Sequence, residues 1–134
     1  MPRAETIQRR RALLRAAQAY IRTNYPDPDL DLREVAAAVG ASTRQLQRVF
    51  RDQAGEDFRS YLLRIRMEQA VKLLTRQRHP LPIHKTPRRV GYRQHSGLRQ
   101  AFLRHYGYNP SEIQRPPPSY VGTEVEGQRA GAPR

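Results

Sequence analysis

The sequence has no cysteine and no long apolar run. The absence of cysteine excludes disulfide bonds, zinc sites built on thiolates and catalysis by a thiol, and it fits a reducing compartment. No stretch approaches the roughly 18 apolar residues of a membrane span. Residues 1–15 also lack the apolar core of a signal peptide. We therefore expect a cytoplasmic protein that makes no contact with a membrane.

Acidic residues are scarce, with 12 Asp and Glu against 25 Lys and Arg and a formal net charge of +13. No acidic residue occurs between Gln69 and Ser111, whereas nine Lys or Arg and all four His fall there. Such an excess indicates a polyanionic partner, nucleic acid before a membrane surface; the alternative is a basic protein without one. Arginine supplies 23 of the 25 basic residues. Its planar fork suits phosphates and guanine edges, although a GC-rich genome would also enrich arginine.

Patterns typical of catalysis and metal binding are also missing. The sequence has no Ser-His-Asp arrangement and no Gly-rich phosphate loop, so an enzyme is not indicated. The four histidines, His79, His84, His95 and His105, are scattered with no Cys or carboxylate near them. We therefore predict no metal site and no cofactor, and we expect His95 and His105 to face DNA or solvent.

Apolar residues recur at helical spacing and no strand pattern stands out, which predicts an all-α fold. Helices are expected over residues 5–24, 57–76, 87–90 and 94–106, with two more that begin at caps. These caps are Asp31 and Ser42, with Glu34 and Gln45 as their capping-box partners. Gly40 should end the helix that Asp31 begins. Residues 116–134, which are rich in Pro, Gly and Ser, are predicted to be disordered.

The helix over 57–76 should bury one side, with Phe58, Leu62, Ile65 and Leu73 along it and Tyr61, Ala70 and Leu74 close to it. The segment after it contains Thr86-Pro87, which allows two interpretations. Either Pro87 interrupts a helix, or Thr86 caps a helix of about one turn in which Pro87 is the first residue. Under either interpretation, we expect the second unit to hold its recognition helix less firmly.

An internal repeat is the most informative feature of the sequence. Leu32, Val39 and Gly40 match Ile83, Val90 and Gly91 at an offset of 51 residues, and Leu46, Phe50 and Gly55 match Leu98, Phe102 and Gly107 at an offset of 52. One extra residue in the second turn explains the change. Each copy is an apolar helix, a glycine turn and a helix that ends in Phe, which is the layout of a helix-turn-helix.

The repeat units resemble those of the AraC family of transcription regulators. Residues 40–51 are similar to that family's first helix-turn-helix, residues 61–70 to its linker helix, and Gly91-Tyr92 with Ser96, Phe102, Gly107 and residues 110–112 to its second unit and closing motif. The resemblance covers about residues 5–115 and implies two helix-turn-helix subdomains joined by one long helix. The chain has the size of stand-alone members of the family, which lack a sensor domain.

In the first unit, a recognition helix starting near Thr43 should present its basic side chains opposite its apolar ones. At about 100° per residue, Arg44, Gln47, Arg48 and Arg51 share the side opposite Leu46, Val49 and Phe50. Arg pairs bidentately with guanine and Gln with adenine. The resemblance independently marks Arg44, Gln47 and Arg48 as base-contacting positions, while Arg51 at the far end should contact phosphate. The expected DNA-binding residues here are Ser42, Thr43, Arg44, Gln47, Arg48 and Arg51; the alternative is a solvated basic face.

The second unit is predicted to be degenerate. Its outward side should carry Arg93, Ser96, Arg99, Gln100 and Leu103 opposite Leu98, Ala101 and Phe102. The resemblance implies His95, Ser96, Gly97 and Gln100 as reading positions, but Gly97 has no side chain and weakens a helix by about 1 kcal/mol relative to Ala. Tyr106 and Tyr108 resemble core and cap residues of this unit. The expected DNA-binding residues here are Arg93, His95, Ser96, Arg99 and Gln100.

These observations predict a sequence-specific, DNA-binding transcription regulator that binds double-stranded DNA as a monomer in the cytoplasm, at the nucleoid. The expected organisation is residues 1–56 as the N-terminal helix and first unit, 57–78 as linker helix, 79–115 as second unit and 116–134 as tail. The alternative function is a helical interaction module that contacts another regulator or RNA polymerase and binds DNA only non-specifically.

Overall fold

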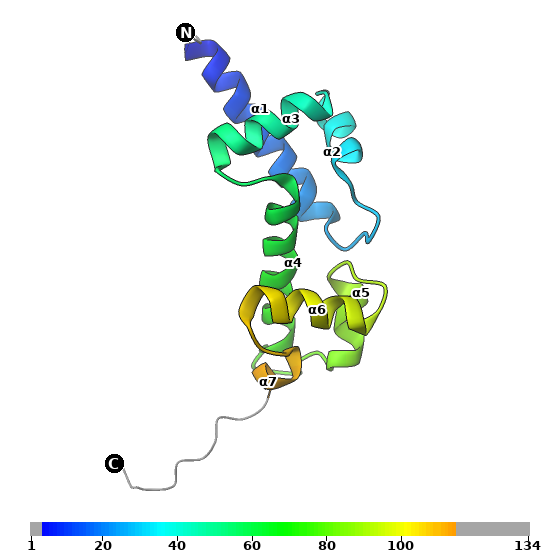
Figure 1. The fold of residues 1–134 in the computed structure, drawn as a ribbon. Helices are drawn as coiled ribbons and strands as arrows, with labels where there is room; N and C mark the ends of the chain where they lie inside the picture. Colours follow the sequence, from blue (N-terminus) through cyan, green and yellow to red (C-terminus); the bar gives the residue numbers. More distant parts are fainter. Residues whose placement is uncertain (1–3, 115–134) are drawn as a thin grey trace, which may run out of the picture.

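The computed structural model describes residues 4–114, in which helices are joined by loops and no strand occurs (Figure 1). The prediction of an all-α fold is therefore confirmed, whereas the predicted disorder of residues 116–134 lies outside the described residues. None of the helices in the described range is long and apolar enough to cross a membrane. The elements are α1 (Ala4–Asn24), α2 (Leu32–Val39), α3 (Thr43–Val49), the π-helical turn η1 (Phe50–Ala54), α4 (Phe58–Leu74), the 3-10 turn η2 (Ile83–Lys85), α5 (Thr86–Arg89), α6 (His95–Tyr106) and α7 (Pro110–Gln114).

The first core forms where α1, α2, α3 and the start of α4 meet. Its buried residues are Leu14, Ala17, Ile21, Leu30, Val35, Ala36, Leu46, Val49, Phe50, Phe58, Tyr61, Leu62 and Ile65. Asp31 caps α2 as predicted, because its carboxylate accepts from the Glu34 amide at 2.9 Å. The predicted capping box is wrong, however, since the Glu34 carboxylate accepts instead from the Tyr20 hydroxyl at 2.7 Å. This contact ties α2 to α1.

The long helix α4 buries different sides at its two ends. Phe58, Tyr61, Leu62 and Ile65 belong to the first core, while Met67, Ala70 and Leu74 belong to a second core. At 100° per residue the two apolar sides are roughly 160° apart around the helix axis. The prediction of one buried side was therefore wrong, and Leu73 is only half-buried. The two units pack against nearly opposite sides of one continuous helix.

The second core is formed by α5, α6 and the end of α4. Its buried residues are Met67, Ala70, Leu74, Val90, Leu98 and Phe102, with Tyr106 and Tyr108 packed against them. The ring of Phe102 lies 4.7 Å from that of Tyr106 and 5.6 Å from that of Tyr108, measured between centroids. The short helix α7 closes this unit, because the Gln114 side chain donates to the carbonyls of Leu74 and Leu81.

The Thr86-Pro87 segment forms a one-turn helix, α5, as one of the two interpretations expected. Thr86 is nevertheless not its cap. It is fully buried, adopts helical dihedral angles (φ −72°, ψ −39°) and donates its hydroxyl to the Pro82 carbonyl at 3.0 Å. Pro82, directly before the 3-10 turn, supplies that carbonyl. Because Thr86 is itself helical, α5 begins one residue earlier than a Thr86 cap would allow.

The internal repeat is present in three dimensions. Gly40 and Gly91 both have positive φ, 73° and 99°, and so do Gly55 and Gly107, 67° and 84°. The helix after Gly40 is capped two residues on, at Ser42, whereas the helix after Gly91 is capped three residues on, at Gln94. The extra residue in the second turn explains the change of offset.

Arg66 joins the two units, although the sequence pattern did not single it out. It lies on α4 between the two cores and is 9% exposed. Its guanidinium donates to the carbonyls of Tyr25 at 3.0 Å and Asp27 at 2.8 Å, which belong to the loop after α1. It also lies 5.4 Å from the ring centre of Tyr92, in the turn of the second unit. Burial lowers the pKa of Arg66, and the nearby Tyr92 opposes that effect.

Gly91 is the residue that allows this contact, and its substitution is a test of it. A Cβ at Gly91 would overlap the Tyr25 carbonyl oxygen and lie 2.5 Å from Arg66 Nε, whereas a Cβ at Gly107 would meet no atom within 4 Å. Both residues have positive φ, so Gly107→Ala should cost the backbone penalty alone, about 1–2 kcal/mol. Gly91→Ala should cost at least about 2 kcal/mol more, because buried polar groups also lose their partners. Urea unfolding of both variants measures the difference, and equal costs would contradict this account of the junction.

Candidate nucleic-acid interface

The helix α3 is held by a complete cap at its N-terminus. The Ser42 hydroxyl accepts from the Gln45 amide and the Gln45 side chain accepts from the Ser42 amide, both at 3.0 Å. The predicted capping box is therefore confirmed. Because both side chains take part, Gln45 is fixed against the backbone and the start of α3 has a defined position.

The outward face of α3 carries the basic residues that the sequence placed there. Leu46, Val49 and Phe50 are buried beneath α3 and η1. The side chains that point away from this core are those of Arg44, Gln47, Arg48 and Arg51, all of them exposed, while Thr43 is half-buried and Ser42 lies in the cap. Arg51 belongs to η1, so it lies two residues beyond the end of α3 proper. These residues form one continuous surface, which we call the α3 face.

The arginines of the α3 face form no ion pair within the described part of the chain. Among the ion pairs of residues 4–114, none includes Arg44, Arg48 or Arg51. Their charge is therefore available to an anionic ligand, unlike that of Arg10, Arg64 and Arg93, which are paired with carboxylates.

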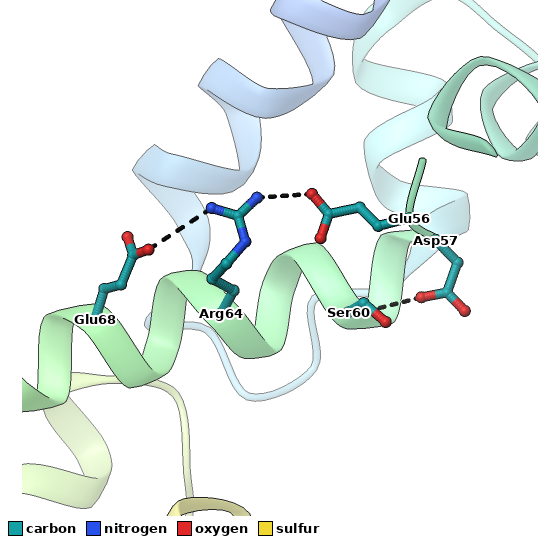
Figure 2. A network of polar contacts seen from close by, with 5 residues as sticks. All are labelled: Glu56, Asp57, Ser60, Arg64 and Glu68. Carbon is teal, nitrogen blue, oxygen red and sulfur yellow. Dashed lines mark hydrogen bonds and ion pairs between the residues drawn. The ribbon is translucent and has the colours of Figure 1, made fainter. Parts of the chain in front are cut away.

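Acidic side chains at the start of α4 are bound within a network of their own. Figure 2 shows Arg64 between the carboxylates of Glu56, at 2.6 Å, and Glu68, at 3.6 Å. The guanidinium of Arg64 also lies 5.1 Å from the ring centre of Tyr61. Asp57 caps α4 by accepting from the Ser60 amide at 2.8 Å, and this bond lowers the pKa of Asp57. The carboxylates near the α3 face thus have partners, which reduces their repulsion of a polyanion.

The helix α6 occupies the corresponding place in the second unit, and both α3 and α6 lie across the direction of α4, one near each of its ends (Figure 1). Leu98 and Phe102 are buried beneath it. Its exposed side chains include those of His95, Ser96, Arg99, Gln100 and Leu103, with Arg93 in the turn before it. We call this surface the α6 face. The structure thus brings the predicted residues of the second unit together on one surface.

Local interactions hold α6 less firmly than α3. Gln94 is its N-cap, but no side chain caps the first turn. Gly97 lies in that turn, and a Cβ there would touch the Tyr92 ring at 3.4 Å, so space does not require glycine. The first turn of α6 therefore lacks a side-chain cap and contains a glycine, which is a poor helix former.

Two arginines of the second unit have intramolecular partners. Arg93 forms an exposed ion pair with Asp29 in the loop after α1. This contact raises the pKa of Arg93 and links the second unit to the first. The Arg99 guanidinium makes a long bond of 3.4 Å to the Asn109 side chain. The α6 face is thus less strongly basic than the α3 face. Across residues 4–114, no group of three His, Asp or Glu is placed to hold a metal ion.

Comparisons with known proteins agree with this geometry. Residues 35–116 match a family model described as a helix-turn-helix domain. The chain is similar to the C-terminal domain of AraT, a response regulator from Geobacillus stearothermophilus, with 32% identity, a TM-score of 0.72 and coverage of 86% of this chain and 93% of that domain. It is also similar to the DNA-binding domain of the global transcriptional factor AdpA, solved in complex with a target DNA, with 26% identity, a TM-score of 0.67 and coverage of 75% and 88%.

A curated relative is the regulatory protein HrpB of Ralstonia nicotianae, 35% identical over 102 residues, which are 75% of this chain and 21% of HrpB. The chain spans between 21% and 65% of the length of the curated relatives it matches.

The difference in capping between α3 and α6 can be measured. Ser42→Ala should lower the free energy of unfolding by about 1 kcal/mol, because the Gln45 amide loses its acceptor. Gln94→Ala should have little effect, since the Gln94 side chain caps nothing. Gln94→Ser should instead raise stability by up to about 1 kcal/mol by supplying the missing cap. Urea unfolding of the three variants provides the comparison; a loss at Gln94→Ala as large as at Ser42→Ala would contradict it.

Proposed function

The chain belongs to the AraC family of helix-turn-helix DNA-binding transcription regulators, and we propose that it binds one specific DNA site as a monomer, with α3 and α6 in successive major grooves. Two such grooves on one side of the duplex lie about one helical turn, or roughly 34 Å, apart, so the whole site would span about 20 base pairs. The proposed role is binding alone, without a catalytic step. Chromosomal DNA as the target implies action in the cytoplasm, at the nucleoid.

The observation that carries this proposal is the pair of exposed helix faces at the two ends of a single helix. Each face lies opposite a buried core, and Arg66 fixes the two cores relative to each other. The helix between them has 17 residues, which corresponds to about 26 Å. That length is of the same order as one turn of DNA, so one monomer can span two half-sites.

In the first unit we assign base contacts to Arg44, Gln47 and Arg48 and a phosphate contact to Arg51. The unpaired charge of the three arginines supports this assignment, as does the fixed position of the capped helix. Bidentate pairing of Arg with guanine and Gln with adenine would supply the specificity. Ser42 and Thr43, at the start of α3, would meet the DNA backbone, where helix N-termini bind phosphate.

In the second unit we assign DNA contacts to Arg93, His95, Ser96, Arg99 and Gln100, with a smaller share of the specificity. A base contact discriminates only if the helix that makes it is held in register. A loosely held helix keeps mainly its phosphate contacts, which carry no direct sequence information. The missing cap and Gly97 in α6 favour this unequal division.

Selection of bound sites from random DNA is the first test of the proposed function. A chain that recovers no consensus and binds all DNA equally would fit the alternative instead, a module that contacts another regulator or RNA polymerase. A recovered consensus provides the DNA for the two measurements below.

The rotational phase of the two half-sites should be critical. Insertion of about 5 base pairs between them moves one half-site to the opposite side of the duplex, where a rigid monomer cannot reach it. We expect affinity to fall to that of a single half-site. An insertion of about 10 base pairs restores the phase but adds roughly 34 Å, which a rigid monomer cannot span either, so it should lower affinity to the same level. Gel-shift titration measures both. Unchanged affinity after the 5 base-pair insertion would contradict the two-groove proposal.

The two faces should differ in what their substitution does. Arg48→Ala should cost about 1–3 kcal/mol of binding free energy and relax the preference at particular base pairs. Gln100→Ala should cost less and leave the sequence preference largely unchanged. Titration against a set of single base-pair substitutions of the selected site gives both quantities. Equal sensitivity of the two half-sites would show that α6 reads bases as firmly as α3.

A further inference from the structure

A basic hollow lies between α1 and α3, beside the α3 face and sharing Arg48 and Arg51 with it. Its volume is about 670 Å³, and it is lined by Thr6, Arg9, Arg10, Leu13, Gln45, Arg48, Val49, Arg51 and Asp52. Four arginines against one carboxylate leave an excess of three positive charges in this small space. Leu13 and Val49 supply apolar surface to the hollow.

The one carboxylate in the hollow holds an arginine of α1 in place. The Arg10 guanidinium donates to Asp52 at 2.8 Å, which connects α1 to η1. The pKa of Asp52 is lowered, first by this bond and then by the charges of Arg10, Arg51 and Arg48. Of these three arginines, Arg10 alone pairs with Asp52 among the described residues, while Arg48 and Arg51 line the same hollow. A guanidinium has five N–H donors, so the bond to Asp52 leaves most of those of Arg10 free for a second acceptor.

The hollow is continuous with the α3 face, since Arg48 and Arg51 belong to both. A helix that lies in a major groove has a phosphate strand on each side of it. The strand on the α1 side of α3 would therefore meet Arg9 and Arg10 of α1. Arg9 is mostly exposed, with a side chain 82% accessible, and its contact to Glu5 is a weak exposed pair of 3.7 Å.

We propose that this hollow is a third DNA contact, which holds a backbone phosphate of the strand beside the groove occupied by α3, with Arg9 and Arg10 as donors. The inference rests on the proposed function, because it takes DNA bound at α3 as given. The charges of the hollow are open to solvent, which suits a phosphate that belongs to a long DNA strand. Arg10 is positioned by Asp52, and Arg9 adds charge at the outer edge.

The test compares two double substitutions on the same helix. Arg9→Ala with Arg10→Ala should weaken binding about tenfold at 0.1–0.2 M salt and reduce the slope of log K against log salt by about 1–2, without changing the base preference. Arg11→Ala with Arg15→Ala is the matched control. It removes the same charge from exposed positions that lie, around α1, roughly 150° and 170° from the midpoint between Arg9 and Arg10, and it should change affinity and slope little.

Two further measurements separate the contact from other causes. Asp52→Asn added to the first variant removes the repulsion between DNA and a carboxylate that has lost its partner. Binding should stay weak, and full recovery would overturn the proposal.

Ethylation of one flanking phosphate should weaken the binding of the wild type and leave that of the Arg9→Ala, Arg10→Ala variant unaffected. Equal losses in the two double variants would mean a general charge effect and would also overturn it. If the wild type binds its selected site specifically and the first variant matches it, this inference alone fails; if the wild type selects no site, the proposed function fails.

Discussion

The buried guanidinium of Arg66 is the interaction on which the arrangement of the two units depends. A charge taken out of water must find polar partners within the protein, or its burial costs several kcal/mol. Arg66 finds them in two carbonyls of the loop after α1 and in the ring of Tyr92. One side chain of the linker helix thus contacts both the first unit and the second, and the chain bends around Gly91 to permit it. Without this contact, the two units would be joined by the helix itself, the exposed Arg93–Asp29 pair and Tyr25, which packs against both cores.

The charge of the chain is distributed according to what each arginine contacts. Arg66 donates to carbonyls and Arg64 pairs with two glutamates, so neither guanidinium is free to bind a phosphate. Arg93 is paired across the two units. The α3 face keeps its arginines free of ion pairs within the described residues. The arginines therefore divide into those held by partners within the protein and those free to bind a phosphate, while all of them contribute to the positive field.

Much of the fold could be predicted from the sequence, because the repeat places matching glycines and apolar residues at constant offsets. The outward placement of Arg44 and Arg48 follows from the same helical period, whereas their contacts to DNA remain a prediction. What could not be predicted depends on tertiary partners. Glu34 binds Tyr20, 14 residues away in sequence, and Thr86 binds a carbonyl of a turn that has no sequence signature. Periodicity likewise could not show that α4 is covered on two different sides, or that Arg66 is buried.

The two-sided burial of α4 limits how proteins of this construction can diverge. One residue inserted in α4 between the two cores would rotate the second unit by about 100° relative to the first and shift it by about 1.5 Å along the helix axis. The contacts of Arg66 with both the loop after α1 and Tyr92 could then not be kept together. Single substitutions on α3 or α6 can alter the recognised bases in small steps, but no small step in α4 can alter the distance between half-sites. The distance between half-sites is therefore fixed by the fold, whereas the recognised base sequence can change by single substitutions.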